Sequence, residues 1–312
     1  MQLLTLRNRS AWNGGNWGMV GRSWAAGIGI AAMWLVSAAA ARADDASSWR
    51  ELETKYLFGF TTGSGIGLEG EKEFTLESIA RFGKREGRYQ ASETKIEFEF
   101  TPSQFVQIEF GALASTHDIR NVSGLDDRNQ VALEGAFAEF RYLLLERTQS
   151  NPLSVTVSFE PTGRTVDETS GERVHNFEFE TKINADIEVI KNRLYAGFNT
   201  VYEPEVTTTS DHVTSREAQL SQSAALALRV LPNLVVGTEA WYLRHYDAAN
   251  LTNFTGDAVL VGPTLFYAIN NKMFVAAAWN AQVWGREVGN PGPYNLAEFQ
   301  RHRVKLKFAL EF

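Results

Sequence analysis

The chain has 312 residues, a formal net charge of −7 and no cysteine. An acidic protein is poorly suited to binding the phosphate backbone of nucleic acids, so no nucleic-acid partner is expected. Without cysteine there are no disulfides and no thiolate metal sites, so stability in an oxidising compartment has to come from the fold.

The first 43 residues are typical of a cleaved export signal. A cationic lead is supplied by Arg7, Arg9 and Arg22. The apolar stretch at 25–36 is shorter than the roughly 20 residues of a spanning helix, and a small-x-small cleavage pattern follows at 41–43. We therefore predict a signal peptide at 1–43 rather than a membrane anchor. Its removal would take four arginines and change the formal charge to −11.

Residues 44–70 form a separate segment before the first predicted strand. It contains the spacing Gly65-x-Gly67-x-x-Gly70, which occurs in dinucleotide-binding turns. Such a turn needs a helix start to hold the pyrophosphate, but residues 74–82 alternate between apolar and polar as a strand does. We interpret the glycines as a flexible connection.

From residue 71 onward, apolar and polar residues alternate with the period of 2 that is typical of strands. In TKIEFEFTP, for example, Ile96, Phe98 and Phe100 oppose charged neighbours. No apolar run beyond residue 43 approaches the length of a spanning helix. We predict twelve strands, near 74–83, 91–100, 104–116, 130–144, 153–160, 173–189, 194–202, 214–230, 234–246, 258–269, 273–285 and 299–312.

The predicted connections alternate between short and long. Tight turns are expected at 101–103, 191–193, 231–233 and 270–272, with a slightly longer one at 148–152. Apart from a short first connection, the connections between them are longer, polar or rich in Gly and Pro. This alternation is expected of an outer-membrane barrel, which has tight periplasmic turns and longer outer loops. A soluble sandwich has no reason to segregate its connections in this way.

The last segment carries the alternation most clearly. Its apolar face is formed by Val304, Leu306, Phe308, Leu310 and Phe312, and the residues between them are mostly basic. With the export signal and the missing cysteine, this pattern resembles bacterial outer-membrane β-barrel proteins. Their last strand typically ends in an aromatic residue that the barrel-assembly machinery recognises. The segment LFGFTTGSGIGLEGEKE is also similar to a group of exported proteins described as outer-membrane transporters, which implies no known activity.

The resemblance implies an all-β fold, a transmembrane antiparallel up-and-down β-barrel of about twelve strands spanning 71–312. It implies a location in the bacterial outer membrane, with lipid and lipopolysaccharide around the barrel. Phe312 would be the assembly signal for the barrel-assembly machinery. An aromatic girdle is expected from Trp241, Tyr242, Tyr246, Phe266, Tyr267, Trp279 and Trp284.

The sequence carries no pattern typical of an enzyme or a cofactor site. Outer-membrane phospholipases use a Ser activated by a His, but no His here is followed two residues later by Ser. His212, with Thr214 at that position, is the nearest case. HExxH, P-loop and EF-hand patterns are also absent from the sequence. The acidic pairs Asp126–Asp127 and Asp167–Glu168 could hold a divalent cation between lipopolysaccharide phosphates, but such acids are more often simply solvated. We predict no catalytic residues, no metal and no cofactor.

Charged side chains are expected inside the barrel, because a basic residue on the lipid face costs about 2–4 kcal/mol at mid-depth. The predicted pore-lining and selectivity residues are Glu97, Glu99, Glu178, Glu180, Arg301, Arg303, Lys305 and Lys307. Glu109, Arg229 and Arg286 are expected to face inward as well. These charges could neutralise each other and fill a narrow interior, or they could set a field across a constriction.

Two functions follow from this architecture. The first is a passive channel or transporter for small solutes, and the alternative is a non-conducting structural or surface barrel. Residues 44–70 could lie in the lumen as a plug or form a periplasmic tail. A strand at 56–62 would make the strand number odd, so we expect this stretch to stay outside the barrel wall.

Overall fold

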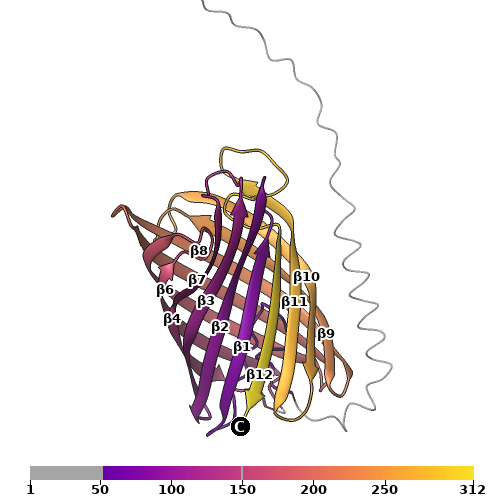
Figure 1. Ribbon diagram of the computed structural model, residues 1–312. Helices are drawn as coiled ribbons and strands as arrows, with labels where there is room; N and C mark the ends of the chain where they lie inside the picture. The colour runs from indigo at the N-terminus through magenta and orange to yellow at the C-terminus, as the bar shows by residue number, and fades with distance from the viewer. Residues whose placement is uncertain (1–51, 149) are drawn as a thin grey trace, which may run out of the picture. The chain divides into compact units, whose positions relative to one another are not determined.

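The computed structural model describes residues 52–148 and 150–312, so the predicted signal peptide and residues 44–51 lie outside the described residues. Twelve antiparallel strands close into one barrel (Figure 1). They are β1 (Lys72–Phe82), β2 (Arg88–Ser103), β3 (Val106–Arg120), β4 (Arg128–Leu145), β5 (Leu153–Val166), β6 (Arg173–Ile190), β7 (Leu194–Thr209), β8 (Thr214–Leu231), β9 (Leu234–Tyr246), β10 (Phe254–Ala268), β11 (Met273–Glu287) and β12 (His302–Glu311). Each strand pairs with its neighbours along the chain, and β1 pairs with β12. The part of the chain that is described contains no helix long and apolar enough to cross a membrane.

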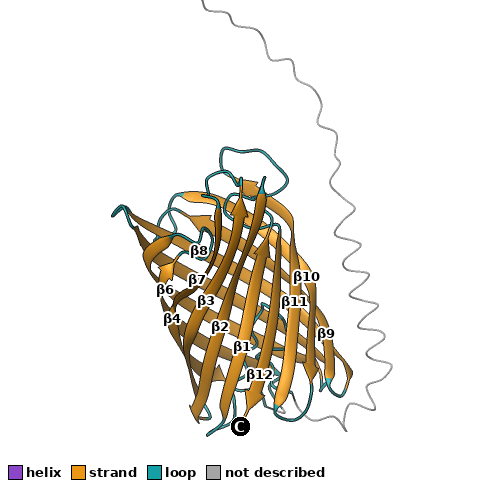
Figure 2. Cartoon of the chain, in the orientation of Figure 1, coloured by secondary structure: helices purple, strands orange, loops and turns teal. Residues whose placement is uncertain are grey.

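The predicted fold class and the predicted number of strands are confirmed, but several strands are longer than expected. β5 continues to Val166 instead of ending near 160, and β7 continues to Thr209 instead of ending near 202. The alternation is weaker there, because Pro, Gly or Thr occupies several outward positions of these strand ends. The connections are correspondingly shorter. The longest described connection, 288–301, joins β11 to β12 at the end of the barrel opposite the C-terminus (Figure 2).

Apolar side chains cover the outer face of the barrel. Ile96, Phe110 and Leu306 are 45%, 52% and 54% exposed although they belong to fully paired strands. Exposing apolar surface to water costs about 25 cal/mol per Å², whereas a lipid-facing band is expected to be apolar. On the same strands, Glu97 and Lys307 point inward and are buried. The alternation of apolar and charged residues therefore places apolar side chains on the outer face of the barrel and charged side chains in its interior.

The barrel interior has two chemically different halves. The charged half, formed by β12 and β1–β6, holds ion pairs such as those of Lys95 with Glu160 and of Arg164 with Glu93. The apolar half, formed by β8–β11, carries few inward charges, and many of its inward residues are small or apolar. These include Ala225, Ala227, Val235, Leu260, Phe266, Phe274, Ala276 and Ala278.

One predicted inward residue lies on the outer face. Arg286 donates hydrogen bonds of 2.9 and 3.1 Å to Asp257 outside the barrel, and its side chain is 59% exposed. The prediction was wrong because a β-bulge shifts the register of β10 and β11 between Val259 and Leu260. A shift of one residue moves the following side chains to the opposite face.

The aromatic girdle is only partly as expected. Trp241 and Phe266 lie inside the barrel, in its apolar half. Tyr267, Trp279 and Trp284 are 42–49% exposed on the outside. An aromatic residue near a strand end packs equally well on either face, so its place in the sequence did not separate the two sides.

Residues 52–70, which we call the inner segment, contact the inward-facing side chains of the barrel. Leu57, Phe58 and Thr61 are at most 1% exposed. The wall closes from β1 to β12 without this segment, whose bridge joins Phe58 to its own Thr61. The expectation that residues 56–62 stay outside the barrel wall is therefore confirmed.

Candidate functional site

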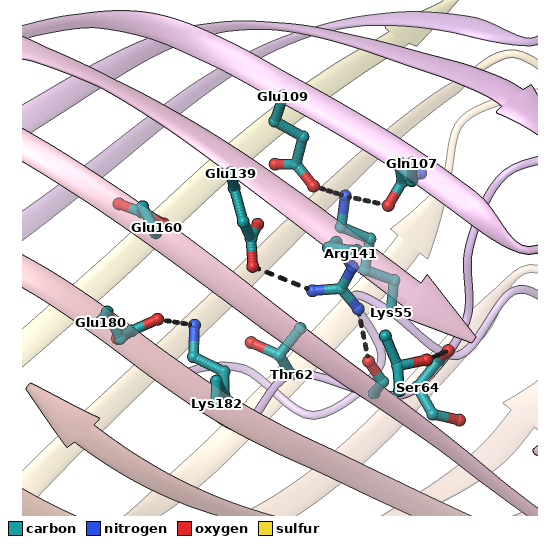
Figure 3. A network of polar contacts seen from close by, with 12 residues as sticks. Lys55, Thr62, Ser64, Gln107, Glu109, Glu139, Arg141, Glu160, Glu180 and Lys182 are labelled. Atoms are coloured by element: carbon teal, nitrogen blue, oxygen red, sulfur yellow. Dashed lines mark hydrogen bonds and ion pairs between the residues drawn. The ribbon is translucent and has the colours of Figure 1, made fainter. Parts of the chain in front are cut away.

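Lys55 of the inner segment binds two acidic side chains of the barrel wall. Its ammonium pairs with the carboxylates of Glu99 on β2 and Glu109 on β3. It also donates to Oε1 of Gln107 at 3.1 Å, and Figure 3 shows the contacts with Glu109 and Gln107. The Lys55 side chain is 3% exposed and each carboxylate 5%. Burial alone would lower the pKa of this lysine, but Glu109 and Glu99 together raise it above its ordinary value. Lys55 is therefore charged, and its one positive charge is shared between the two acidic side chains.

Asp186 on β6 binds two parts of the inner segment that are ten residues apart. Its Oδ2 accepts hydrogen bonds from Thr54 Oγ1 at 2.7 Å and from the N and Oγ of Ser64 at 2.6 Å. Its Oδ1 pairs with Arg147. Thr54 and Ser64 are buried, so water does not compete for these charge-assisted bonds. Asp186 thus closes the inner segment into a loop fixed to the wall.

Glu239 on β9 holds the tip of this loop. Its carboxylate accepts from Phe60 N at 3.1 Å, Thr61 N at 2.7 Å and Thr61 Oγ1 at 2.9 Å. It also accepts from Trp241 Nε1 and Asn280 Nδ2, each at 3.1 Å. Five donors therefore surround one acid in the otherwise apolar half, which satisfies a buried charge that would be costly alone.

The inner segment also fits the apolar half by its shape. Tyr56, Leu57 and Phe58 belong to one buried cluster with wall residues, and the Tyr56 ring lies 4.8 Å from that of Phe274. Gly59 has a φ of 83°. A Cβ at this position would lie 2.6–2.9 Å from atoms of Thr264, Ala278 and Glu239. Glycine is required there because the backbone passes too close to the wall for any side chain.

Four of the eight predicted pore-lining residues form ion pairs near the inner segment. Lys307 binds Glu97 at 3.0 Å, and Lys305 binds Glu77 on β1 at 2.8 Å. Glu99 pairs with Lys55. The sequence-based expectation that closure brings the basic ladder of β12 near Glu97 and Glu99 thus agrees with the register. Each of these charges has a partner of opposite sign.

The other predicted residues lie in different surroundings. Glu178 pairs with Arg164, and Glu180 pairs with Lys182 on the same strand. Arg301 precedes β12, and its guanidinium stacks on the Tyr294 ring at 3.7 Å, within the connection 288–301. Arg303 faces the lumen with its guanidinium 4.1 Å from the centre of the Phe60 ring.

The inner segment separates two cavities. The first, of about 940 Å³, lies toward the short turns and is bordered by Glu53, Thr54 and Ser64. The second, of about 280 Å³, lies toward the loops and is bordered by Lys55, Phe60 and Thr62 of the segment. We call it the loop-side cavity. Its walls carry eleven acidic and ten basic residues, so their charges nearly cancel.

One group of acids among the described residues has metal-ligand spacing. Carboxylate oxygens of Glu53, Glu71 and Glu311 lie within 4.8 Å of one another. Carboxylates are suitable ligands for hard cations, but nothing besides this spacing indicates a ligand. The acids considered earlier in the loops have other roles, since Asp127 accepts from Asn121 N and Asp167 accepts from Ser170 N at 2.7 Å.

Sequence reasoning missed the residues that hold the inner segment. Lys55, Asp186 and Glu239 were not among the predicted site residues, and neither was Arg141, which donates to Gly63 O at 3.0 Å. Glu239 did carry a signal, because a lone acid in the apolar strand LVVGTEAWYL needs a buried partner. The other three look like ordinary alternating or connecting residues.

The chain matches one family and several solved structures, of which the one with a TM-score above 0.5 supports the fold. The profile of DUF6662, described as a family of unknown function, matches residues 50–312. The COG4313 outer membrane channel from Pseudomonas putida F1 is 10% identical, with a TM-score of 0.53 over 80% of this chain and 97% of that chain. The translocator domain of the autotransporter NalP from Neisseria meningitidis is 11% identical, with a TM-score of 0.47 over 79% and 90% of the two chains. The NanC porin is 11% identical, with a TM-score of 0.45 over 77% and 98%. No curated protein matches the sequence.

Proposed function

We propose that this chain, which belongs to the DUF6662 family, is a bacterial outer-membrane channel for small solutes whose inner segment occludes the lumen. In this proposal the barrel wall is the channel and residues 52–70 are its plug. Lipid and lipopolysaccharide surround the apolar outer face, and the C-terminal strand ending in Phe312 is recognised by the barrel-assembly machinery.

The observation that carries the proposal is that the lumen is divided by a segment that the wall does not need. The barrel closes from β1 to β12 without it, and a cavity lies on each side of it. Eight strands would leave room only for side chains, whereas 16 to 18 leave an open channel. A twelve-stranded barrel lies between these limits, where one inserted segment is enough to close the path.

The polar character of the contacts also favours a removable plug. Asp186 and Glu239 bind the segment, and Lys55 of the segment binds Glu99 of the wall, through hydrogen bonds and ion pairs that water can replace once the segment leaves. Three carboxylates that would remain in the lumen (Glu99, Glu109 and Glu239) suit a hydrated path and would be costly in a permanently dry core.

The experiment is single-channel conductance in planar bilayers with two forms of the protein. The first is the chain from residue 44, and the second lacks residues 52–70. We expect little or flickering current from the first and a steady, larger current from the second.

A matched control keeps residues 52–70 and replaces Leu68, an exposed residue, with Ala, which should leave the current unchanged. Silence from both the full and shortened forms would contradict the channel proposal, provided that both show the heat-modifiable mobility of a folded barrel on a gel. That outcome would favour the structural barrel instead.

A further inference from the structure

Arg303 has no hydrogen-bond acceptor among the described residues, although it points into the loop-side cavity. Its Nε and Nη2 are buried and unpartnered. Most other basic residues of this cavity bind a carboxylate, for example Lys305 with Glu77 at 2.8 Å and Lys307 with Glu97 at 3.0 Å. Lys84 donates instead to backbone oxygens of the connection 288–301. Among the described basic residues of this cavity, Arg303 is thus the one without a hydrogen-bond acceptor.

Aromatic rings cover the flat faces of this guanidinium. Its centre lies 4.1 Å from the Phe60 ring and 4.8 Å from the Trp241 ring. Rings of this kind stabilise a cation through their faces, but they leave its N–H edges without acceptors. The nearby carboxylate of Glu239 is already surrounded by donors from the tip of the inner segment. The edges of Arg303 therefore remain available to a ligand.

The chemistry of an arginine edge restricts what that ligand can be. A guanidinium fork matches a carboxylate through two parallel hydrogen bonds. Buried N–H groups without an acceptor are unfavourable, and an anion that binds to them removes that penalty. An anionic group supplied from outside the chain would therefore complete the hydrogen bonds of Arg303.

The surroundings of Arg303 define the rest of the ligand. The cavity wall on this side is apolar, with Val201, Leu243 and Phe299 beside Phe60 and Trp241. Farther round the same cavity lies Glu203, which forms no ion pair with a described residue and would repel a second negative charge. The volume of about 280 Å³ corresponds to roughly nine water molecules at about 30 Å³ each. These features fit a small ligand that is apolar apart from one acidic group.

We propose that the loop-side cavity is a binding subsite for small organic monocarboxylates with an apolar or aromatic body, held through the carboxylate by Arg303. The inference rests on the proposed channel function, because it names the class of solute that would bind in the lumen during passage. In this role Arg303 is a specificity-determining residue. The inner segment contributes to the site through Phe60.

The test is isothermal titration calorimetry of the full chain, folded in detergent, with benzoate as the probe. Benzamide and benzylamine have the same ring but carry no charge and a positive charge, respectively, and sulfate tests for a bare anion. We expect benzoate to bind at least tenfold more tightly than any of the other three. Equal binding of benzoate and benzylamine, or no heat with benzoate up to 10 mM, would overturn the proposal.

Three variants distinguish a direct contact between Arg303 and the carboxylate of benzoate from a general effect of the positive charge in the cavity. Arg303→Gln should weaken benzoate binding by roughly 10- to 100-fold, as expected for the loss of a charge-assisted pair. Lys95→Gln changes the cavity charge by the same amount at a distant ion pair with Glu160, and it should change the affinity less than threefold. Arg303→Lys keeps the positive charge but lacks the two parallel N–H donors of the guanidinium. Its affinity for benzoate should lie between those of the other two variants. Equal losses in Arg303→Gln and Lys95→Gln would refute the assigned contact.

The conductance measurements keep this inference distinct from the proposed function. If the form lacking residues 52–70 conducts while benzoate does not bind the full chain, the channel stands and the subsite is refuted. If no form conducts but benzoate binds through Arg303, the subsite stands and the channel is refuted. Heat-modifiable mobility on a gel confirms that each variant is folded.

Discussion

Replacing Lys55 by Met should release the inner segment while leaving the barrel wall intact. Methionine keeps the length and the apolar stem of the side chain but removes its charge. The carboxylates of Glu99 and Glu109, each 5% exposed, would then lose the cation that both of them contact. Because Gln107 and Tyr56 can offer only neutral donors, the docked state would keep two buried carboxylates that no cation contacts directly.

The size of the effect follows from the burial of this group. Removing one partner of a buried ion pair costs about 3–5 kcal/mol. The penalty applies only while the segment is docked, since undocking exposes both carboxylates to water in the lumen. At about 1.4 kcal/mol per factor of ten, the undocked population should rise by roughly 10²- to 10³-fold.

Hydrogen exchange measured by mass spectrometry reports this change directly. Amides of the inner segment, such as Thr61 N on Glu239 and Ser64 N on Asp186, exchange when the segment undocks. Peptides covering 56–66 should exchange roughly 10²- to 10³-fold faster in Lys55→Met, while peptides from β2 and β3 should not change. The control is Lys182→Met, which breaks the ion pair with Glu180 without touching the inner segment. Unchanged exchange in Lys55→Met, or equal acceleration in Lys182→Met, would refute the reasoning.

Three further predictions address the tip of the inner segment, the lumen charges and the last residue. Gly59→Val should displace the tip, because even a Cβ would lie under 3.0 Å from the wall; tryptic cleavage after Lys55 should accelerate at least tenfold, and Leu68→Val should have no such effect. In the form lacking residues 52–70, replacing Arg303 and Lys305 by Gln should leave Glu77 without its Lys305 partner and shift the reversal potential in a salt gradient toward cation selectivity. An unchanged potential would show that these residues do not set selectivity. Deleting Phe312, which is 60% exposed, should reduce the amount of assembled barrel in cells severalfold while leaving refolding in detergent unchanged; equal assembly with and without Phe312 would contradict its role as the signal.

The wall could be predicted from the sequence because a lipid-facing barrel imposes a strict period of 2. Residues such as Ile96 and Leu306 cannot exchange faces with their charged neighbours without a large cost in free energy. The alternating pattern therefore predicts the number of strands correctly. The prediction failed where that constraint is absent. The strand ends near Val166 and Thr209 have Pro, Gly or Thr at several outward positions, and the bulge in β10 and β11 turned Arg286 outward.

The contacts of the inner segment could not be predicted, because they depend on which distant residues the barrel brings together. Lys55 lies 44 and 54 residues from its partners Glu99 and Glu109 in sequence. Nothing in the local pattern around Lys55 distinguishes a buried lysine from a solvated one. Likewise, Arg303 was correctly placed on an inward face, but its lack of an acceptor depends on Phe60 and Trp241 covering it.

The most direct test of the account is a reversible tether between the inner segment and the wall. The chain has no cysteine, and Thr61 Oγ1 lies 3.0 Å from Ser223 Oγ on β8, so Thr61→Cys with Ser223→Cys offers a disulfide site. In the Lys55→Met background, single-channel current should vanish when this pair is oxidised and return when it is reduced. Current that persists through the oxidised protein would contradict the claim that the inner segment closes the channel.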